Sequence, residues 1–328
     1  MKTDHASTGL AVAELPQGRL SYLVAGPPSS SRPPVVFAHG LLVDSRLWAP
    51  VAERLAAEGI RSYAPTLPLG AHELEMNADA DLSPQGLAGL VSDFIAALGL
   101  DNVTIVGNDT GGAICQLLLA GEADRIGAAV LTNCDAFGTF PPRALAPLFF
   151  AGRHPAIVAC LLPGLRSARV RTGRLGFGPL TSAPLDAGLT RSWIEPLAGG
   201  GIRRDLAKFA RGVHPQVLLD AAGRLGRFAG PVRILWGDDD PYFGAELGRR
   251  LSEAFPHASL ATVPGGRTFL PLEHPGAVAA EVIAAVRDAV PHQGRLPRLP
   301  PVTSEIVAAR GREECTGTMM PGSVITKD

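Results

Sequence analysis

The sequence predicts an α/β fold with a mainly parallel sheet that helices cover on both faces. Short apolar runs typical of buried strands alternate with segments of helical spacing along most of the chain. Such alternation indicates crossover connections between parallel strands. One apolar run, residues 103–106, leads into Gly107-Asn108-Asp109-Thr110-Gly111 and then an apolar helix. A glycine-flanked strand-to-helix turn of this kind is typical of α/β enzymes.

The individual elements are predicted from spacing and from start and stop signals. Ser83 before Pro84 is a good N-cap, and Gly59 stops an earlier helix. The predicted strands are residues 10–15, 19–25, 35–38, 60–63, 103–106, 128–132, 232–236 and 259–263. The predicted helices are residues 49–58, 83–98, 111–120, 244–254 and 275–290.

Three parts of the chain are expected to differ in organisation. Residues 1–135 and 230–290 carry the strand–helix alternation and form the predicted core. Residues 136–229 are rich in Pro, Gly and Arg with helix-like pieces and no clear strand, which predicts an inserted helical cap. Residues 291–328 are polar and punctuated by Pro and Gly, so we expect a C-terminal extension without a core of its own.

Composition limits the kinds of partner. The chain has 328 residues, of which 46% are hydrophobic and 19% charged, enough for one large domain or two smaller ones. A net charge of −1 argues against nucleic acid or an acidic membrane surface as the main partner. The N-terminal ten residues are polar, and the apolar stretches are too short to span a bilayer. We therefore expect a cytoplasmic protein; nothing in the sequence indicates its oligomeric state.

No cofactor or metal is expected. The four cysteines are scattered without ligand spacing, and no Gly-rich phosphate loop or dinucleotide fingerprint is present. The expected partner is a small molecule.

Asp109 occupies the apex of the glycine-flanked turn, where a serine is more common. Gly107 and Gly111 flank it, because a Cβ in so tight a turn would clash. A strained apex of this kind tends to persist at functional sites. A carboxylate there suggests a covalent ester to an sp³ carbon, as in opening an epoxide or displacing a halide.

The motifs in order resemble the α/β-hydrolase fold over roughly residues 9–290. They are His39-Gly40, the Asp109 elbow, an inserted cap and Gly237-Asp238-Asp239-Asp240 after a strand. The aspartate elbow is similar to that of haloalkane dehalogenases and epoxide hydrolases. The resemblance implies an oxyanion hole made by the backbone N–H groups of Leu41 and Thr110.

The resemblance also implies an acid that completes the catalytic set. It falls on Asp240, at the end of the G-x-x-D turn. A second family position for this acid falls on Asp135, which is equally well explained as a loop carboxylate at the entry to the cap.

The sequence departs from the family at the general base. The family histidine lies in a pattern that begins at Gly266 and ends at Pro275 here, and Thr268 holds the histidine's place. A threonine hydroxyl cannot act as a base near neutral pH. His39 is expected to support its loop. Among the other histidines, His72 is a candidate for lining the site, because it follows a parallel strand.

The residues that would bind a leaving group are also missing. The subgroup's polar residue after His-Gly and Trp after the nucleophile are replaced by Leu41 and Thr110, and all three tyrosines fall outside the predicted cap. Thr110, Asn108 and Trp193 remain as candidate donors. The expected pocket is apolar and suits a medium-sized hydrophobic molecule; its candidate lining residues are Leu41, Leu42, Phe137, Phe140, Leu148, Phe149 and Phe269.

Three functions are compatible with these residues. The first is a hydrolase with Asp109 as nucleophile and a rearranged or missing base. The second is a lyase, cyclase or isomerase in which Asp109 acts as acid or base, with a pKa raised by burial. The third is a binding protein that kept the pocket and lost the chemistry. Fold alone does not choose among them.

Overall fold

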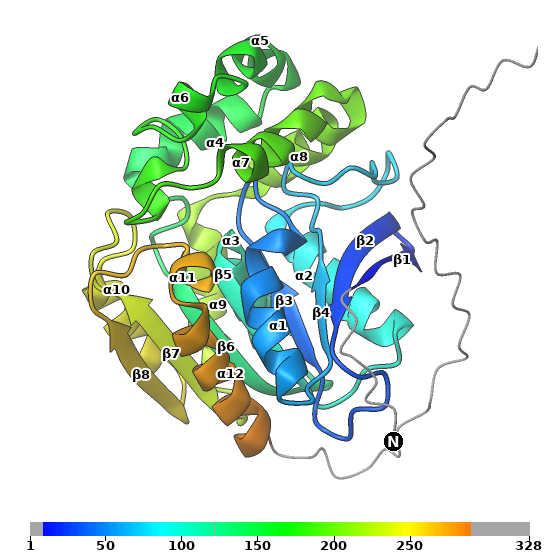
Figure 1. Cartoon of the computed structure of the whole chain (residues 1–328), viewed down its shortest axis with the longest axis vertical. Helices are drawn as coiled ribbons and strands as arrows, with labels where there is room; N and C mark the ends of the chain where they lie inside the picture. The colour runs from blue at the N-terminus through cyan, green and yellow to red at the C-terminus, as the bar shows by residue number, and fades with distance from the viewer. Residues whose placement is uncertain (1–8, 122, 290–328) are drawn as a thin grey trace, which may run out of the picture.

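The computed structural model describes residues 9–121 and 123–289, so the predicted extension 291–328 lies outside the described residues. A twisted sheet forms the centre of the molecule, with helices on both of its faces (Figure 1). A separate group of short helices lies beyond one end of the strands, at the top of the view. This arrangement is the predicted α/β fold.

The sheet has eight strands in the order β1-β2-β4-β3-β5-β6-β7-β8. They are β1 (Gly9–Leu15), β2 (Gly18–Ala25), β3 (Val35–Ala38), β4 (Ser62–Pro65), β5 (Val103–Asp109), β6 (Ile126–Cys134), β7 (Val232–Gly237) and β8 (Ala258–Val263). The pairs β1–β2 and β2–β4 are antiparallel, and all others are parallel. The mainly parallel sheet is therefore confirmed.

The central strands are buried over their whole length. Every residue of β3, β5 and β6 is buried, whereas β1 at the edge alternates between exposed and buried positions. Strands covered on both faces need continuous apolar runs, and an edge strand with one solvated face needs alternation. The site described below lies at the carboxyl end of these central strands.

Helices cover the two faces of the sheet. One buried cluster joins the sheet to α2 (Pro84–Ala97), α3 (Thr110–Ala120), α9 (Pro215–Leu225) and α10 (Ala245–Glu253). The other joins it to α1 (Ala49–Ala57), the short α11 (Leu270–Glu273) and α12 (Pro275–Asp288), with η1 (Ser45–Trp48) before α1. Ser83 caps α2 as expected: its Oγ accepts a hydrogen bond of 3.1 Å from the Gly86 amide.

The cap consists of short helices between β6 and α9. They are η2 (Arg143–Leu145), α4 (Ala146–Gly152), α5 (Pro155–Leu165), α6 (Ala168–Arg171), η3 (Gly178–Leu180), α7 (Ala187–Ile194), η4 (Glu195–Ala198) and α8 (Gly200–Gly212). The sequence placed residues 215–225 in the cap as well. In the structure these residues form α9, which packs against α3 beside the sheet, because its buried apolar side completes the core on that face.

Candidate active site

The Asp109 turn has the backbone strain that its glycines suggest. Asp109 ends β5 and precedes α3 with φ 54° and ψ −131°, a region that non-glycine residues rarely adopt. A Cβ on Gly111 would lie 2.1 Å from the Ala38 carbonyl oxygen, and one on Gly107 would lie 2.7 Å from the Gly112 Cα. The explanation of both glycines by close packing is confirmed.

Two backbone amides hold the Asp109 carboxylate. Its Oδ2 accepts a hydrogen bond of 3.1 Å from the Leu41 amide, and the adjacent Thr110 amide also lowers the pKa of this carboxyl. The approach of Leu41 requires a glycine before it, since a Cβ on Gly40 would lie 2.0 Å from Asp109 Oδ2. The two amides predicted to form an oxyanion hole therefore converge on the carboxylate.

Asp109 is poised to exchange a proton near neutral pH. Burial raises the pKa of this carboxyl to about 7, and the negative charge of Asp240 adds to the increase. The two amides act in the opposite direction because they stabilise the ionised form. A carboxyl with this pKa can act both as an acid and as a base at physiological pH.

Four hydrogen bonds hold Asp240 in the turn that follows β7. Its Oδ1 accepts from the amides of Tyr242 at 2.8 Å and Phe243 at 3.0 Å. Its Oδ2 accepts from the Thr268 hydroxyl and the Asn133 Nδ2, each at 2.9 Å. Burial nevertheless raises the pKa of Asp240. The surface arginine nearby bonds elsewhere, since Arg267 pairs with Asp239 at 2.7 Å.

Asn133 connects β6 to β7 beneath Asp240. Its Oδ1 accepts from the Gly237 amide at 2.7 Å, and its Nδ2 donates to the Gly237 carbonyl at 3.0 Å as well as to Asp240. No role for Asn133 was predicted from the sequence. One sequence signal could have indicated a role: Asn133 directly follows a predicted apolar strand, and a buried polar side chain there needs hydrogen-bond partners.

Asp135, just after β6, is a second buried carboxyl beside Asp109. Its Oδ2 accepts a hydrogen bond of 3.4 Å from the Thr110 hydroxyl, and its Oδ1 is buried without a partner in the described structure. Burial raises the pKa of Asp135 well above its usual value, and the charge of Asp109 raises it further. Both effects favour the protonated form of Asp135.

Asp109, Thr110 and Asp135 line one cavity beneath the cap. The cavity and its mouth enclose about 1210 Å³. Its walls are mostly apolar, with Leu41, Leu42, Leu148 and Phe149 among them as expected. Arg174 and Tyr242 also line it. Tyr242 lies outside the cap, as predicted, but the loop between β7 and α10 brings it to the cavity.

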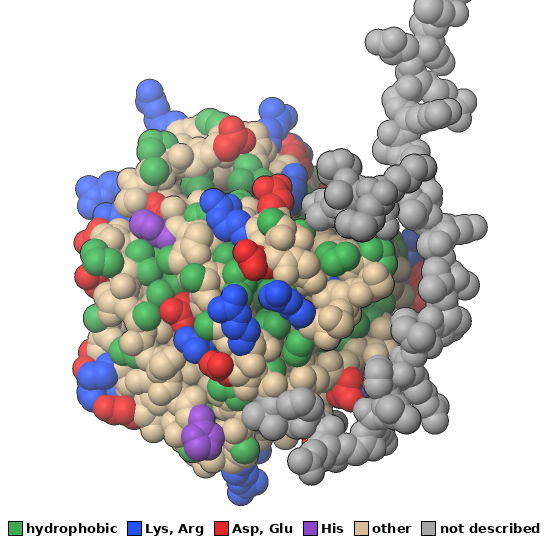
Figure 2. All heavy atoms as spheres, turned by 60° about the horizontal axis from the view of Figure 1, so that its bottom comes forward, with side chains coloured by type: hydrophobic (Ala, Val, Ile, Leu, Met, Phe, Trp, Pro, Cys, Tyr) green, Lys and Arg blue, Asp and Glu red, His purple; other side chains and the backbone are tan. Residues whose placement is uncertain are grey.

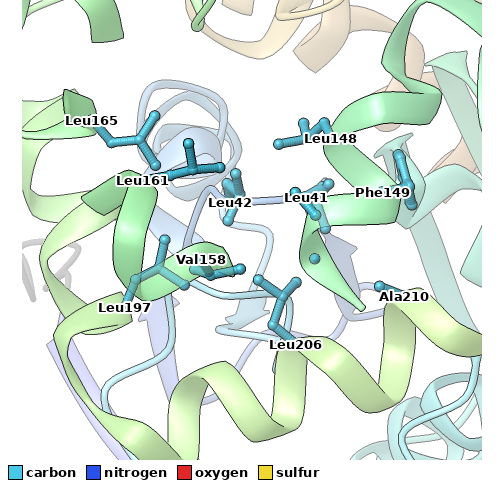
Figure 3. A pocket seen from close by; sticks show the side chains of 12 residues that line it. Leu41, Leu42, Leu148, Phe149, Val158, Leu161, Leu165, Leu197, Leu206 and Ala210 are labelled. Atoms are coloured by element: carbon cyan, nitrogen blue, oxygen red, sulfur yellow. The ribbon is translucent and has the colours of Figure 1, made fainter. Parts of the chain in front are cut away.

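A smaller apolar cavity, which with its opening to solvent encloses about 430 Å³, adjoins the first. The two cavities share Leu41, Leu42, Leu148, Phe149 and Leu165. In Figure 3, leucines of α5 and side chains of α4 surround Leu41 and Leu42 from the cap side. The shared residues indicate one bent apolar space with two carboxyls at one end.

Several residues predicted to belong to the site do not line the cavity. The His72 ring lies 3.4 Å from Asp205 on α8 and is absent from the cavity lining. It connects the loop after β4 to the cap. Trp193 is fully buried and packs edge-on against Phe177 and Phe269, behind the cavity wall. Of these three aromatic residues, only Phe177 lines the cavity.

Asn108 and Thr268 lie beneath the site. The Asn108 Nδ2 donates to Thr132 Oγ1 at 2.9 Å and to the backbone carbonyls of Asn133 and Thr268 at 3.3 and 2.6 Å. Its donor is therefore engaged by the protein and not directed at a ligand. The Thr268 side chain is fully buried, with its hydroxyl on Asp240. Phe137 and Phe140, expected at the pocket, are also absent from its lining.

His39 has the supporting role expected of it. Its Nε2 accepts from the Leu67 amide at 2.8 Å, and its Nδ1 lies 2.9 Å from the Gly40 carbonyl. Burial lowers the pKa of His39 to about 4, so the ring is neutral at physiological pH. This neutral ring holds the loop that presents the Leu41 amide.

Comparison with known proteins shows to which family the chain belongs. The model of the alpha/beta hydrolase family matches residues 35–281. The chain therefore belongs to the alpha/beta hydrolase family. Within that family its relatives include haloalkane dehalogenases and hydrolases of 2-hydroxy-6-oxononadienedioate.

The relatives differ in how much of the chain they match. A haloalkane dehalogenase of Mycolicibacterium paratuberculosis is 31% identical over 69% of this chain and 73% of its own length. A 2-hydroxy-6-oxononadienedioate/2-hydroxy-6-oxononatrienedioate hydrolase of Dechloromonas aromatica is 27% identical over 55% of this chain. That match spans 59% of the relative, which is less than two thirds of its length.

Solved structures agree on the fold. The haloalkane dehalogenase DbeA from Bradyrhizobium elkani superposes with a TM-score of 0.70 at 18% identity, covering 86% of this chain and 98% of that chain. An enol-lactonase from Burkholderia xenovorans superposes with a TM-score of 0.65 at 18% identity, covering 84% and 100%. The fold is thus common to enzymes with different names.

Proposed function

We propose that this protein is an enzyme that transfers protons on a medium-sized, largely apolar small molecule, with Asp109 as the base and Asp135 as the acid. The observation that carries the proposal is that both carboxyls line the same cavity. Among the described residues that line it, none is a histidine. The reaction class is a lyase, cyclase or isomerase reaction that does not require an activated water.

The two carboxyls differ in the way that acid–base catalysis needs. Asp109 has two amides that stabilise its ionised form, whereas Asp135 receives only the Thr110 hydroxyl and has one oxygen without a partner. Burial and the charge of Asp109 both raise the pKa of Asp135, which favours its protonated form. Neighbouring carboxyls whose pKa values are pushed apart are a common source of one acid and one base.

The proton balance of the step is simple. Ionised Asp109 takes a proton from one atom of the substrate, and Asp135 gives its proton to another. The substrate is rearranged or divided without a net change in its protons. The enzyme is left with Asp109 protonated and Asp135 ionised, and one proton passed from Asp109 to Asp135 restores it. Thr110, which touches both carboxyls, lies between them.

Proton exchange tests this proposal without knowledge of the natural substrate. Apolar ketones and esters are incubated with the protein in D₂O, and deuterium uptake beside the carbonyl is followed by NMR. We expect uptake that falls by at least about 100-fold in Asp109→Asn and Asp135→Asn. Asp220→Asn, at an exposed carboxylate of α9, is the matched control. Uptake unchanged in Asp109→Asn would contradict the assignment.

A second candidate function has Asp109 as a nucleophile, as in a dehalogenase-like or epoxide hydrolase-like enzyme. It is favoured by the Leu41 amide, which binds Asp109 Oδ2 at 3.1 Å, and by the place of Asp109 in the cavity lining. The Thr268 hydroxyl donates to Asp240 and cannot activate water, so an ester on Asp109 should accumulate. Intact-mass measurement after incubation with alkyl halides and epoxides tests this. An adduct on Asp109 supports the nucleophile, and deuterium exchange without an adduct supports the base.

A further inference from the structure

Two consecutive cap helices carry no charged residue. These are α4 (Ala146–Gly152) and α5 (Pro155–Leu165). The segment formed by η2 and α4 meets α5 at a bend of 111°. Among the described residues, no single helix is long and apolar enough to cross a bilayer. A helix at the surface of a globular protein normally has a charged outer face. The outer face of α5 is instead formed by Ala156, Ile157, Cys160, Leu161, Pro163 and Gly164.

Large apolar side chains are exposed on this part of the cap. Phe150 is 58% exposed, Leu161 48% and Leu175 92%, with Leu148 and Ile157 exposed to lesser extents. We call these five residues the apolar cap face. In Figure 1, α5 lies at the end of the molecule farthest from the sheet. Exposed apolar surface of this kind marks an interaction site more often than a solvated surface.

The cap is also strongly basic. Residues 136–214 contain 11 Lys and Arg against 3 Asp and Glu, a net charge of about +8 in a chain whose total is −1. The three acids leave little free negative charge: Asp205 is buried, Glu195 bonds Arg166 and Arg191, and Asp186 caps α7. A net charge of −1 disfavours an acidic membrane surface only if the charge is spread evenly over the chain. In this chain the positive charge is concentrated in the cap.

Arginines flank the helices of the apolar cap face along the chain. Arg143 precedes α4, Arg153 lies between the two helices, and Arg169 and Arg174 follow α5. None of these four forms an ion pair with a carboxylate of the described structure; Arg153 donates to backbone carbonyls. By contrast, the end of the molecule remote from the cap shows acidic and basic side chains intermingled (Figure 2).

We propose that the apolar cap face docks on an anionic lipid surface, with Phe150 and Ile157 inserted and the flanking arginines on lipid phosphates. Exposed apolar side chains between arginines have the composition of segments that lie in the membrane interface. A second copy of this chain is a poorer occupant. A symmetric dimer would set the same patch against itself, and two sets of unpaired arginines would then face each other.

The docking face is continuous with the cavities. Leu148 and Leu161 are exposed on the cap face and also line the smaller cavity, and Leu175 lines the larger one. A protein seated in this way presents its cavity wall to the apolar part of the membrane. This docking does not depend on which chemistry Asp109 performs, so it stands or fails separately from the proposed function.

Vesicle flotation tests the proposal. The full-length protein is mixed with phosphatidylcholine vesicles, with or without phosphatidylglycerol, and the floating fraction is measured. We expect binding only to vesicles with phosphatidylglycerol, weakening as salt increases. The double variant Phe150→Ser/Ile157→Ser should no longer float. Arg143→Glu and Arg169→Glu should each weaken binding by about fivefold or more.

Matched controls separate docking from general stickiness or unfolding. Leu260→Ser removes a similarly exposed residue from β8, and Arg287→Glu reverses a charge on α12. Both controls should float as the unchanged protein does, and circular dichroism confirms that each variant is folded. The proposal is overturned if the folded protein does not bind anionic vesicles or if Phe150→Ser/Ile157→Ser floats normally. A stable dimer that this double variant dissociates would overturn it too.

Discussion

The hydroxyl of Thr268 donates a 2.9 Å hydrogen bond to Asp240 Oδ2, and the Asn133 Nδ2 donates to the same oxygen. Thr268 is thus part of the site's polar network even though it is not a base. The interaction stabilises the ionised form of Asp240 and so opposes the rise in its pKa that burial causes. Its contribution, and those of three other features, can be measured directly.

Thr268→Val should destabilise the protein by about 1–3 kcal/mol, because it removes a buried donor to a carboxylate while keeping the side-chain shape. Thr262→Val, at an exposed position of β8, should change the free energy of unfolding by less than about 0.5 kcal/mol. Urea denaturation of both variants measures the difference. Equal effects in the two variants would mean that the hydroxyl of Thr268 contributes nothing specific.

Asp109 should make the protein less stable as pH rises. The pKa of its carboxyl is about 7 in the folded state, against 3.8 ordinarily, so between these values the folded state binds more protons than the unfolded state. Stability then falls by on the order of 1.4 kcal/mol per pH unit from about pH 4 to pH 7 and levels off above that. Asp109→Asn should remove this contribution.

The measurement is the free energy of unfolding at several pH values for both proteins. The Asn variant should be the more stable of the two at pH 8, and the difference should shrink towards pH 4. Parallel pH profiles would show that Asp109 has an ordinary pKa in the folded protein.

Gly40→Ala should impair the site more than the fold. A Cβ here would lie 2.0 Å from Asp109 Oδ2, so the carboxylate must move away from the Leu41 amide. We expect the deuterium exchange activity to fall by about 100-fold or more, as when one donor to a reacting oxygen is lost. Gly89→Ala in α2, where a Cβ meets no atom within 4 Å, should leave activity unchanged and stability slightly increased.

Asn133→Ala should destabilise the protein by roughly 2–4 kcal/mol. The variant removes the buried partner of the Gly237 amide and carbonyl and one of the two side-chain donors to Asp240 Oδ2. Asn77→Ala removes a solvent-exposed donor to the Pro16 carbonyl and should cost far less. Thermal unfolding compares the two; a small loss in Asn133→Ala would show that water replaces the amide.

Local sequence patterns predicted most of the fold. Residues 35–38 were predicted as a strand with the bounds of β3, because a buried strand on both faces leaves an unbroken apolar run. Ser83 and Pro84 marked the beginning of α2 for the same local reason. Residues 215–225 could not be assigned correctly from spacing, since a helix of the cap and a helix of the core have the same amphipathic pattern.

Some residues of the site could likewise be predicted from local sequence, and others could not. Asp109 and its glycines follow from the chemistry of one tight turn, and Asp240 from a short motif. The places of His72, Asn108 and Trp193 depend on residues far away in the chain, such as Asp205 at 3.4 Å from His72. Sequence spacing contains no information on which buried polar group will meet which partner.

By itself, the sequence determined the α/β fold, the strained turn at Asp109 and the threonine in the family's histidine position, because each is encoded within a few neighbouring residues. Only the tertiary structure decided that Asp109 and Asp135 share one cavity and that the Thr268 hydroxyl binds Asp240. These are relations between distant segments, and packing in three dimensions is what brings such segments together.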